Sequence, residues 1–396
     1  MPAACAILRP RKLTPFLNRH PWVLDSAISK VQGDPADGDE IDLVADGGSW
    51  VARGVYNSQS RIRIRLYSWQ AGESLDGGFW RRHIERALEL RRSLGYGRLD
   101  EACRLVYSEA DSLSGLIVDR FRNHFVVQPT ALATAIRLPA ITAVLVELAQ
   151  PDSITIRADA LIARREGIRI DTGCIFGTPP GGPIEICEHG LRYSVNLLEG
   201  QKTGFYLDQR ENRRRAAEFL AGRRVLDVCC YSGSFSLAAL RVGSAAEVVG
   251  LDVSETAVRT AQENAQRNGL PAAQFVTGDC FQSLEQRRAA GETFSAVILD
   301  PPKFARSRDQ VPEALRAYHR LNRLAVELLE PGGILVTCSC SGSVLREDFA
   351  SMLLGVATKT RRTIRVLEQR GAAPDHPLNL ACPETDYLKC FICRVE

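Results

Sequence analysis

The stretch RRVLDVCCYSGS, residues 223–234, determines the fold class predicted for this chain. An apolar run of strand length reaches Asp227, and a turn that contains Gly233 follows it, with a helix expected from about Ser234. A strand, a tight turn and a helix in this order form the repeating unit of doubly wound α/β sheets, whose ligands bind beyond the carboxyl ends of the strands. The residues that end each strand are therefore the candidates for function.

The same unit recurs through the C-terminal half of the chain. From about residue 183, apolar runs alternate with helical patterns such as residues 254–268, with Ser254 as candidate N-cap and Gly269 just past the end. The further strand-like runs are EVVGLDV (247–253), AAQFVTGD (272–279), FSAVILD (294–300), GILVTCS (333–339) and KCFICRV (389–395). This alternation predicts a parallel sheet that is covered by helices on both faces.

Three domains are expected from the 396 residues, of which 45% are apolar and 24% charged, as in soluble globular proteins. Residues 1–72 are rich in turn signals and predict a β-rich module. Residues 73–182 predict an α+β domain, with helices near residues 80–94 and 132–149. Residues 183–396 form the predicted doubly wound domain.

The composition argues against a membrane protein. No run of 18 uncharged apolar residues occurs, so no membrane partner is expected. The N-terminal sequence lacks the apolar segment of a signal peptide, which predicts a cytoplasmic protein whose twelve cysteines are free thiols. Cys390 and Cys393 have the C-x-x-C spacing, but on a strand this spacing sends them to opposite faces, and no second pair accompanies them. No metal site is therefore predicted.

Three acids end the first three predicted strands, namely Asp227, Asp252 and Asp279. Asp252 is placed to accept hydrogen bonds from both hydroxyls of a ribose, and Asp279 is placed to meet an adenine amino group. The N–H groups at the start of the helix after Gly233 suit a carboxylate. Taken alone, each acid has the alternative of being a helix cap.

The strand ends also exclude two cofactor classes. Neither the G-x-G-x-x-G turn of nicotinamide cofactors nor the G-x-x-x-x-G-K-[ST] loop of nucleotide phosphates follows these strands. A cofactor with a ribose and an adenine but no phosphate suits the ordered set of acids, which predicts S-adenosylmethionine. The predicted cofactor-binding residues are Asp227, Tyr231, Ser232, Gly233, Asp252, Asp279, Asp300 and Pro301.

The fourth and fifth strands end in the motifs DPPK (300–303) and CSC (338–340). These strands are neighbours in this architecture, so Asp300 and Cys340 should face one pocket. A thiolate that adds to C6 of a pyrimidine raises the electron density at C5, which can then attack a sulfonium methyl group. The pair therefore predicts methylation of a pyrimidine at C5, with Cys340 as nucleophile and Asp300 binding the base.

Two points in this chemistry stay open. Cys340 has the alternative of being a buried structural thiol, the commonest state of a free cysteine, whereas Cys338 is expected inside the strand. The base that removes the C5 proton is not identified, and Glu384 and Asp386 are its candidates because they are titratable residues in a loop.

A basic stripe is predicted near the N-terminus. Within residues 61–66, Arg61, Arg63 and Arg65 alternate with apolar residues, so a strand would carry three guanidinium groups on one face. Such a face can hold a phosphate backbone, although a solvated strand surface explains the pattern equally well.

Seven short motifs are spread over nearly the whole chain: Arg19–Trp22, Gly115–Arg120, Lys202–Arg210, Asp300–Phe304, Ser339–Ser341, Asp375–Pro377 and Tyr387–Lys389. With them, the chain resembles the ribosomal large subunit methyltransferase I family, the bacterial 23S rRNA cytosine-C5 methyltransferases. The resemblance implies an N-terminal PUA domain that binds RNA and a small central α+β domain. It further implies an α/β class I S-adenosylmethionine methyltransferase domain, which is Rossmann-like with a mixed seven-stranded sheet.

By this resemblance, the activity is S-adenosylmethionine-dependent methylation of C5 of a specific cytosine in 23S rRNA, through a covalent adduct between Cys340 and C6. The implied partner is 23S rRNA of the large subunit or its precursor, and a homodimer stays open. The residues expected to contact the substrate RNA are Arg61, Arg63, Arg65, Lys202, Tyr206, Arg210 and Lys303.

Two alternative functions stay open. RNA uracil-C5 enzymes share the Asp-Pro-Pro motif and the late cysteine. Many RNA cytosine-C5 enzymes carry a second cysteine where this chain has Pro302, so product release here cannot use a second thiol at that place. The other alternative is an RNA-binding scaffold with an idle catalytic domain, against which the presence of Asp252, Asp300 and Cys340 argues.

Overall fold

The computed structural model describes residues 4–198 and 203–396, and the chain divides into two compact units. The first unit comprises Met1–Ile186, Val195–Phe205 and Pro374–Thr385, and the second unit comprises Cys187–Ser194, Tyr206–Ala373 and Asp386–Glu396. The domain boundaries at residues 72 and 182 stay predictions, because the first unit contains both the β-rich module and the α+β segment.

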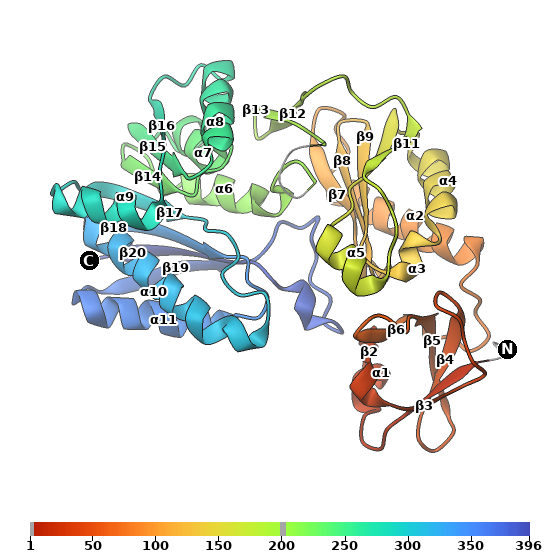
Figure 1. Cartoon of the computed structure of the whole chain (residues 1–396). Coiled ribbons are helices and arrows are strands. Elements are labelled where there is room, and N and C mark those ends of the chain that lie inside the picture. Colours follow the sequence, from red (N-terminus) through yellow and green to blue (C-terminus); the bar gives the residue numbers. More distant parts are fainter. Residues whose placement is uncertain (1–3, 199–202) are drawn as a thin grey trace. The chain divides into compact units, whose positions relative to one another are not determined.

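The β-rich module of the first unit is a six-stranded sheet in the order β2-β6-β5-β4-β1-β3 (Figure 1). Alternate residues of its strands are buried in a core of their own, as Ile41, Leu43, Ile64 and Leu66 show. Its elements are β1 (Cys5–Leu8), α1 (Thr14–Leu17), β2 (Trp22–Leu24), β3 (Ile28–Gln32), β4 (Glu40–Val44), β5 (Trp50–Tyr56) and β6 (Ile62–Ser68).

The α+β segment forms a five-stranded sheet in the order β11-β10-β9-β8-β7, with a second core between this sheet and its helices. The predicted helix at 132–149 is two helices, because Pro139 lacks an N–H donor and is tolerated only in the first turn of a new helix. The elements are α2 (Gly77–Ser93), β7 (Ala102–Tyr107), β8 (Leu116–Phe121), β9 (His124–Pro129), α3 (Leu132–Ala135), α4 (Leu138–Ala149), β10 (Ser153–Ile156), α5 (Ala160–Glu166) and β11 (Gly173–Gly177).

The segment Pro374–Thr385 returns to the first unit late in the chain. Asp375 fixes this return, because its carboxylate accepts a hydrogen bond from the backbone N–H of Arg104 at 2.9 Å and its carbonyl accepts one from Arg91 at 2.8 Å. The hydroxyl of Tyr107 donates to the carbonyl of Thr385 at 3.0 Å. The motif at 375–377 therefore has a structural role in this unit.

The second unit is a seven-stranded sheet in the order β16-β15-β14-β17-β18-β20-β19. The first five strands of this order are parallel, and β20 runs antiparallel to both β18 and β19, which makes the sheet mixed. The strands are β14 (Arg224–Val228), β15 (Glu247–Asp252), β16 (Ala273–Thr277), β17 (Phe294–Leu299), β18 (Leu329–Ser339), β19 (Ile364–Arg370) and β20 (Lys389–Val395). A separate pair, β12 (Ile184–Glu188) and β13 (Leu191–Val195), forms a two-stranded sheet.

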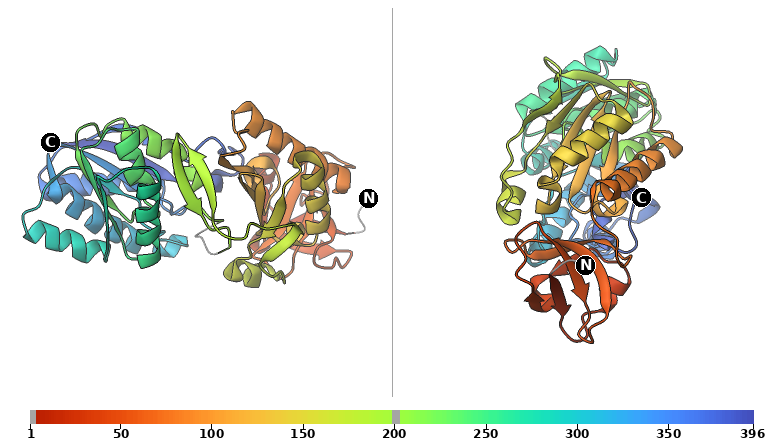
Figure 2. Two further views of the ribbon diagram at one scale, coloured as in Figure 1. Left: turned by 90° about the horizontal axis from the view of Figure 1, so that it is seen from above. Right: turned by 90° about the vertical axis from the view of Figure 1, so that its right-hand side faces the viewer.

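Helices cover both faces of this sheet (Figure 1 and Figure 2). Alternate residues of β17 enter two different cores: Val297 and Leu299 pack with α10, whereas Ala296 and Ile298 pack with α6 and α7. The helices are α6 (Arg210–Ala217), α7 (Ser234–Arg241), α8 (Glu255–Arg267), α9 (Cys280–Ala289), α10 (Val311–Leu328) and α11 (Arg346–Thr360). The Oγ of Ser254 accepts a hydrogen bond from the N–H of Ala257 at 3.3 Å, so the predicted N-cap is confirmed. Within the described ranges, no helix is long and apolar enough to cross a membrane.

The predicted basic stripe is interrupted in the structure. Arg61 is exposed, but Arg63 is half-buried and pairs with Asp25 at 3.0 Å. Arg65 is buried between the β-rich module and the α+β segment, where it pairs with Glu109 at 3.2 Å and with Glu166 at 3.1 Å. A guanidinium that is committed to two buried carboxylates does not face a phosphate backbone, so the RNA contact predicted for Arg65 is corrected to a structural role.

This ionic cluster favours the charged form of Glu109. Burial alone would raise its pKa, but the charge of Arg65 and hydrogen bonds from Ser108, Ser114 and Trp22 together lower the pKa of Glu109 below its ordinary value. Because the pKa of Glu109 is lower in the folded protein than in the unfolded chain, this group stabilises the fold at pH values above the ordinary glutamate pKa. The stabilisation is lost as the pH falls through the lowered pKa of the folded state.

We expect Arg65→Met to destabilise the first unit by about 3–5 kcal/mol, because both carboxylates would stay buried without their cation. Arg61→Met, which removes an exposed arginine from the same strand region, should change stability by less than about 0.5 kcal/mol. Urea unfolding followed by tryptophan fluorescence reports on this unit alone, since all four tryptophans, Trp22, Trp50, Trp69 and Trp80, lie within it. Equal effects of the two substitutions would contradict this role of Arg65.

Candidate active site

The carboxyl ends of β14, β17 and β18 meet at one edge of the seven-stranded sheet. These strands are parallel neighbours, with Val228 paired to Leu299 and Leu299 paired to Thr337. Asp300 directly follows β17, and Cys340 directly follows β18. The predicted adjacency of strands four and five is therefore confirmed, and both side chains leave the sheet from the same edge.

Asp227 lies fully buried near the end of β14. Its Oδ2 accepts hydrogen bonds from the N–H and the hydroxyl of Ser236 at 3.0 and 2.6 Å, whereas its Oδ1 is buried without a partner among the described residues. Burial raises the pKa of Asp227 to about 7, although the bonds from Ser236 oppose this shift. A buried acceptor that lacks a donor is the observation expected where a ligand supplies the donor.

The loop after β14 is held in a conformation that brings backbone N–H groups to this edge. Cys229, Tyr231 and Gly233 have positive φ angles of 61°, 49° and 78°. A Cβ at Gly233 would lie 2.9 Å from the ring of Phe275 and 3.1 Å from Cβ of Ala261, so only glycine fits there. The Oγ of Ser232 is also buried and has no partner among the described residues.

The second and third acids have different environments. Asp252, at the end of β15, accepts a hydrogen bond from the N–H of Tyr231 at 2.9 Å on one oxygen and from that of Ser254 at 3.0 Å on the other. A carboxylate offers about four lone pairs, so both oxygens keep capacity for ribose hydroxyls. Asp279 is exposed and caps α9 by accepting from the N–H of Gln282 at 3.0 Å. The helix-cap alternative therefore holds for Asp279, and its contact with adenine stays a prediction.

These residues suit the predicted cofactor. S-adenosylmethionine has an amino group that could donate to the buried Oδ1 of Asp227, and its ribose hydroxyls match the carboxylate of Asp252. The N-cap of α7, Gly233, has no side chain, and Asp227 binds the N–H of Ser236, so the remaining N–H groups of the first turn suit the carboxylate of the methionine part.

The loop that follows β17 carries the predicted base-binding acid. Asp300 is half-buried and its Oδ1 accepts a hydrogen bond from Nε2 of Gln209 at 3.1 Å. Gln209, in the 3₁₀ helix Leu207–Gln209, is fixed in turn by Asn212, which donates to its Oε1 at 2.7 Å. Pro301 is buried, whereas Lys303 is exposed. Sequence reasoning did not identify Gln209 as a partner of Asp300, because only the fold brings the two together.

Cys340 is half-buried, while both serines beside it are fully buried. Oγ of Ser339 lies 3.0 Å and Oγ of Ser341 lies 3.1 Å from the hydroxyl of Tyr318 on α10. Oγ of Ser341 also accepts a hydrogen bond from the N–H of Ala305 at 3.2 Å. Because Ala305 lies in the loop that begins at Asp300, this hydrogen bond ties the cysteine loop to the Asp-Pro-Pro loop.

Tyr206 lies beside these two loops. Burial raises the pKa of its hydroxyl, and the charge of Asp300 acts in the same direction. The rings of Tyr206 and Tyr231 meet edge to face, with centroids 5.3 Å apart. The prediction that Tyr206 lies near the cofactor or the RNA stays open to both.

Arg210 has a structural environment that differs from the predicted RNA contact. Its side chain is buried, with Nε 3.5 Å from Oε2 of Glu188. Arg213 binds the same carboxylate through two bonds of 2.7 Å and donates to the carbonyl of Tyr206 at 2.9 Å. Arg213 therefore holds both Glu188 and the backbone at Tyr206, Arg210 lies against the same carboxylate, and the RNA contact predicted for Arg210 stays a prediction. Lys202 lies outside the described residues.

Lys389 is a candidate site residue that sequence reasoning missed. It lies at the start of β20, opposite Ser339, and its buried Nζ donates to the carbonyls of Ser341 at 2.7 Å and Tyr387 at 2.8 Å. Burial lowers the pKa of Lys389 to about 8, against the opposing charges of Asp386 and Cys340. The available signal was a lysine that begins the otherwise apolar run KCFICRV.

Known proteins match the chain over most of its length. A family model described as S-adenosylmethionine-dependent methyltransferase matches residues 110–382, and one described as PUA-like domain matches residues 6–69. Ribosomal RNA large subunit methyltransferase I of Aeromonas hydrophila is 39% identical over 384 residues, which are 96% of each chain. The protein of that name from Photobacterium profundum is 39% identical over 382 residues, again 96% of each chain. This chain belongs to the ribosomal RNA large subunit methyltransferase I family.

Solved structures share the fold of this family member. A protein from Streptococcus mutans described as a SAM-dependent methyltransferase superposes with a TM-score of 0.85 at 20% identity, covering 98% of this chain and 99% of that one. A methyltransferase complexed with SAH gives 0.84 at 21% identity with the same coverage. The predicted fold class and cofactor are confirmed: the chain is an S-adenosylmethionine-dependent methyltransferase with an N-terminal PUA-like domain.

We expect Gly233→Ala to weaken binding of S-adenosylmethionine at least about tenfold, because the new methyl group collides with Phe275 and Ala261 and must shift the cofactor loop. Gly269→Ala is the matched control, since Gly269 also has a positive φ, of 62°, but open space around its Cβ position. Calorimetric titration with the cofactor measures both variants. An equal loss in the two variants would attribute the effect to backbone strain rather than to the loop.

Proposed function

We propose that this methyltransferase modifies C5 of a specific cytosine in 23S rRNA through a covalent adduct between Cys340 and C6 of the base. The observation that carries the proposal is the joined pair of loops: Asp300 and Cys340 follow neighbouring strands, and the Ser341–Ala305 hydrogen bond holds their loops together. The names of the relatives, ribosomal RNA large subunit methyltransferase I, support the choice of substrate.

The chemistry follows from the residues at this edge. The thiolate of Cys340 forms a bond to C6, and the displaced π electrons raise the electron density at C5. Asp300 accepts or donates a hydrogen bond at the N3 or N4 edge of cytosine and stabilises the adduct. The bound cofactor supplies a methyl group on a sulfonium centre. Loss of the C5 proton to a base then returns the electron pair, and the S–C6 bond breaks to release Cys340.

Lys389 explains how the thiol of Cys340 is activated. Its Nζ holds the carbonyl of Ser341, the residue after the nucleophile, and its charge interacts with Cys340. A nearby ammonium group favours a thiolate over a thiol. We assign Lys389 as a positioning residue that also stabilises the nucleophilic form of Cys340.

Each of the two candidate bases lies beside a basic side chain. Glu384 lies 3.2 Å from His20, and this contact lowers the pKa of Glu384 to about 2, which makes it a weak base. Asp386 lies 3.3 Å from Arg346. Since Asp386 belongs to the second unit together with Cys340, it is the candidate we retain.

RNA contact is proposed for the basic residues that stay exposed. Arg61 and Lys303 are both exposed, on the PUA-like module and on the loop after Asp300. Arg63 forms an ion pair with Asp25, so we expect it to contribute less to RNA binding.

We expect Cys340→Ala to abolish methyl transfer to deproteinised large-subunit RNA and to form no adduct with RNA that contains 5-fluorocytosine. Cys338→Ala is the matched control, because Cys338 is buried inside β18, and it should keep both properties in part. Labelled cofactor, gel separation under denaturing conditions and nucleoside analysis provide the readouts. Labelled 5-methyluridine would favour the uracil alternative, and an inactive wild type would favour the idle scaffold.

We expect Lys389→Met to raise the apparent pKa of the Cys340 thiol by about 1–2 units, because the ammonium group that interacts with Cys340 is lost. The rate of alkylation by iodoacetamide is measured against pH, with the Cys340 peptide quantified by mass spectrometry to separate it from the other cysteines. Lys303→Met, at an exposed lysine, should shift the profile much less. An unchanged profile in Lys389→Met would leave the lysine with a structural role only.

A further inference from the structure

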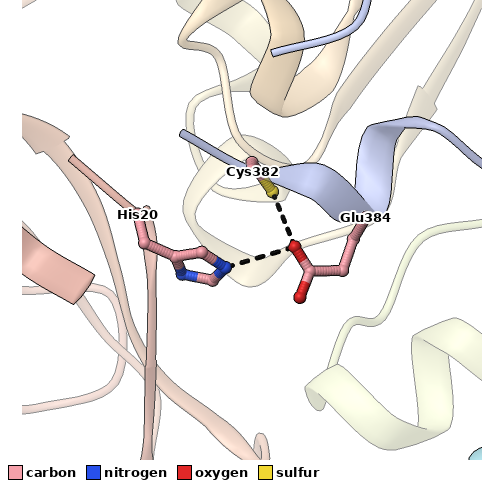
Figure 3. Close-up of side chains that lie close together, drawn as sticks. All are labelled: His20, Cys382 and Glu384. Atoms are coloured by element: carbon pink, nitrogen blue, oxygen red, sulfur yellow. Dashed lines mark hydrogen bonds and ion pairs between the residues drawn. The ribbon is translucent and has the colours of Figure 1, made fainter. Parts of the chain in front are cut away.

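A cluster of three metal-ligand side chains lies in the first unit, apart from the residues assigned to methyl transfer (Figure 3). Nε2 of His20 lies 3.2 Å from Oε2 of Glu384, and Sγ of Cys382 lies 3.5 Å from the same oxygen. The ligand atoms of all three residues lie within 4.8 Å of one another. Figure 3 shows His20 and Cys382 approaching this carboxylate from two different segments of the chain.

These separations suit a tetrahedral zinc ion. Zinc binds sulfur at about 2.3 Å and nitrogen or oxygen at about 2.0–2.2 Å, so tetrahedral geometry places neighbouring ligand atoms about 3.3–3.6 Å apart. The separation of 3.5 Å between Cys382 and Glu384 lies within that range, the separation of 3.2 Å between His20 and Glu384 is about 0.1 Å below it, and Nε2 of His20 lies within 4.8 Å of Sγ of Cys382. A nitrogen, a sulfur and an oxygen ligand together also favour zinc over calcium or magnesium, which prefer oxygen alone.

We propose that His20, Cys382 and Glu384 form a zinc site that fastens the returning segment Pro374–Thr385 to the β-rich module, the part of the chain that matches the PUA-like domain. Three protein ligands leave the fourth position of the ion to a water molecule. The side chain of Glu384 is 45% exposed and that of His20 is 20% exposed, which gives the ion a path from solvent, while Cys382 is buried.

The ligand loop is held in place before any metal binds. The N–H of Cys382 donates to the carbonyl of Asn379 at 2.9 Å, and the N–H of Thr385 donates back to the carbonyl of Cys382 at 3.0 Å. The side chain of Asn379 donates to the carbonyl of Glu109 at 2.8 Å, which anchors the loop to the α+β segment. Cys382 and Glu384, on either side of Pro383, are therefore presented by a turn whose backbone is already ordered.

Zinc binding must displace three existing hydrogen bonds, those from His20 and Cys382 to Glu384 and that from Trp22 to His20. Nδ1 of His20 accepts a hydrogen bond from the N–H of Trp22 at 3.2 Å, so Nε2 carries the ring proton and donates it to Glu384. With zinc on Nε2 the proton moves to Nδ1, and the bond from Trp22 is lost. These three hydrogen bonds, two of them 3.2 Å long and the third from a thiol, are replaced by three metal–ligand bonds, one of them to a thiolate.

The test titrates Zn²⁺ into the full chain, freed of metal and kept reduced, in competition with a chromophoric chelator. We expect one equivalent to bind tightly, and Cys382→Ser to lose at least about 100-fold in affinity, since loss of an outer partner alone costs up to that much. Cys174→Ser, which changes an exposed cysteine elsewhere in the first unit, should bind as the wild type does. Bound Co²⁺ should show a thiolate charge-transfer band that disappears in Cys382→Ser and stays in Cys174→Ser.

His20→Gln provides an independent variant for the case that Cys382→Ser does not fold. We expect His20→Gln to fold, because His20 is half-buried. It should also lose the tight equivalent. Zinc should raise the unfolding midpoint followed by tryptophan fluorescence in the wild type and not in His20→Gln. The proposal is overturned if the wild type binds no tight equivalent, or if Cys382→Ser or His20→Gln binds Zn²⁺ as tightly as the wild type.

Discussion

The parallel pairing of β17 with β18 is the constraint on which the active site depends. The pairing sets Leu299 opposite Thr337, so Asp300 and Cys340 must leave the sheet at the same edge. Backbone hydrogen bonds fix the strands only up to this edge, and the loops beyond it need other restraints. The buried hydroxyl of Ser341 supplies one of them, because it receives the N–H of Ala305 and contacts Tyr318. The loops that carry Cys340 and Asp300 are thus joined by a side-chain hydrogen bond beyond the ends of their strands.

Buried charged side chains have two kinds of environment in the described part of this chain. Arg65 with Glu109, Arg104 with Asp119, and Arg213 with Glu188 are buried pairs in which each charge meets its counter-ion. Asp227 and Lys389 instead bond to a serine and to backbone carbonyls, and burial moves the pKa of each toward neutrality. Strongly perturbed groups of the second kind concentrate where ligands bind, which is why both lie at the edge that carries the proposed chemistry.

What the sequence could predict follows the range of the interactions involved. Strand-length runs and the Ser254 cap depend on neighbours within a few residues, and both were predicted correctly. The alternation around Arg65 is visible in the sequence, but Glu109 and Glu166, which neutralise it, lie in another segment. For the same reason, the sequence did not predict that Gln209 lies beside Asp300 or that Arg210 pairs with Glu188. Local patterns therefore gave the elements and the strand-end acids, whereas the partners of long side chains depend on the tertiary fold.

The contrast between Cys338 and Cys340 shows how the end of a strand sets the exposure of a thiol. The two residues are two apart, so a continuing strand would send both side chains to the same face, where Cys338 is buried in the core opposite Cys390. β18 ends at Ser339, and Cys340 leaves that face to become half-buried instead. A thiol buried in an apolar core stays protonated and inert, whereas one at the edge can meet both a cation and a substrate. Moving the strand end by one residue would therefore remove the proposed chemistry without changing any side chain.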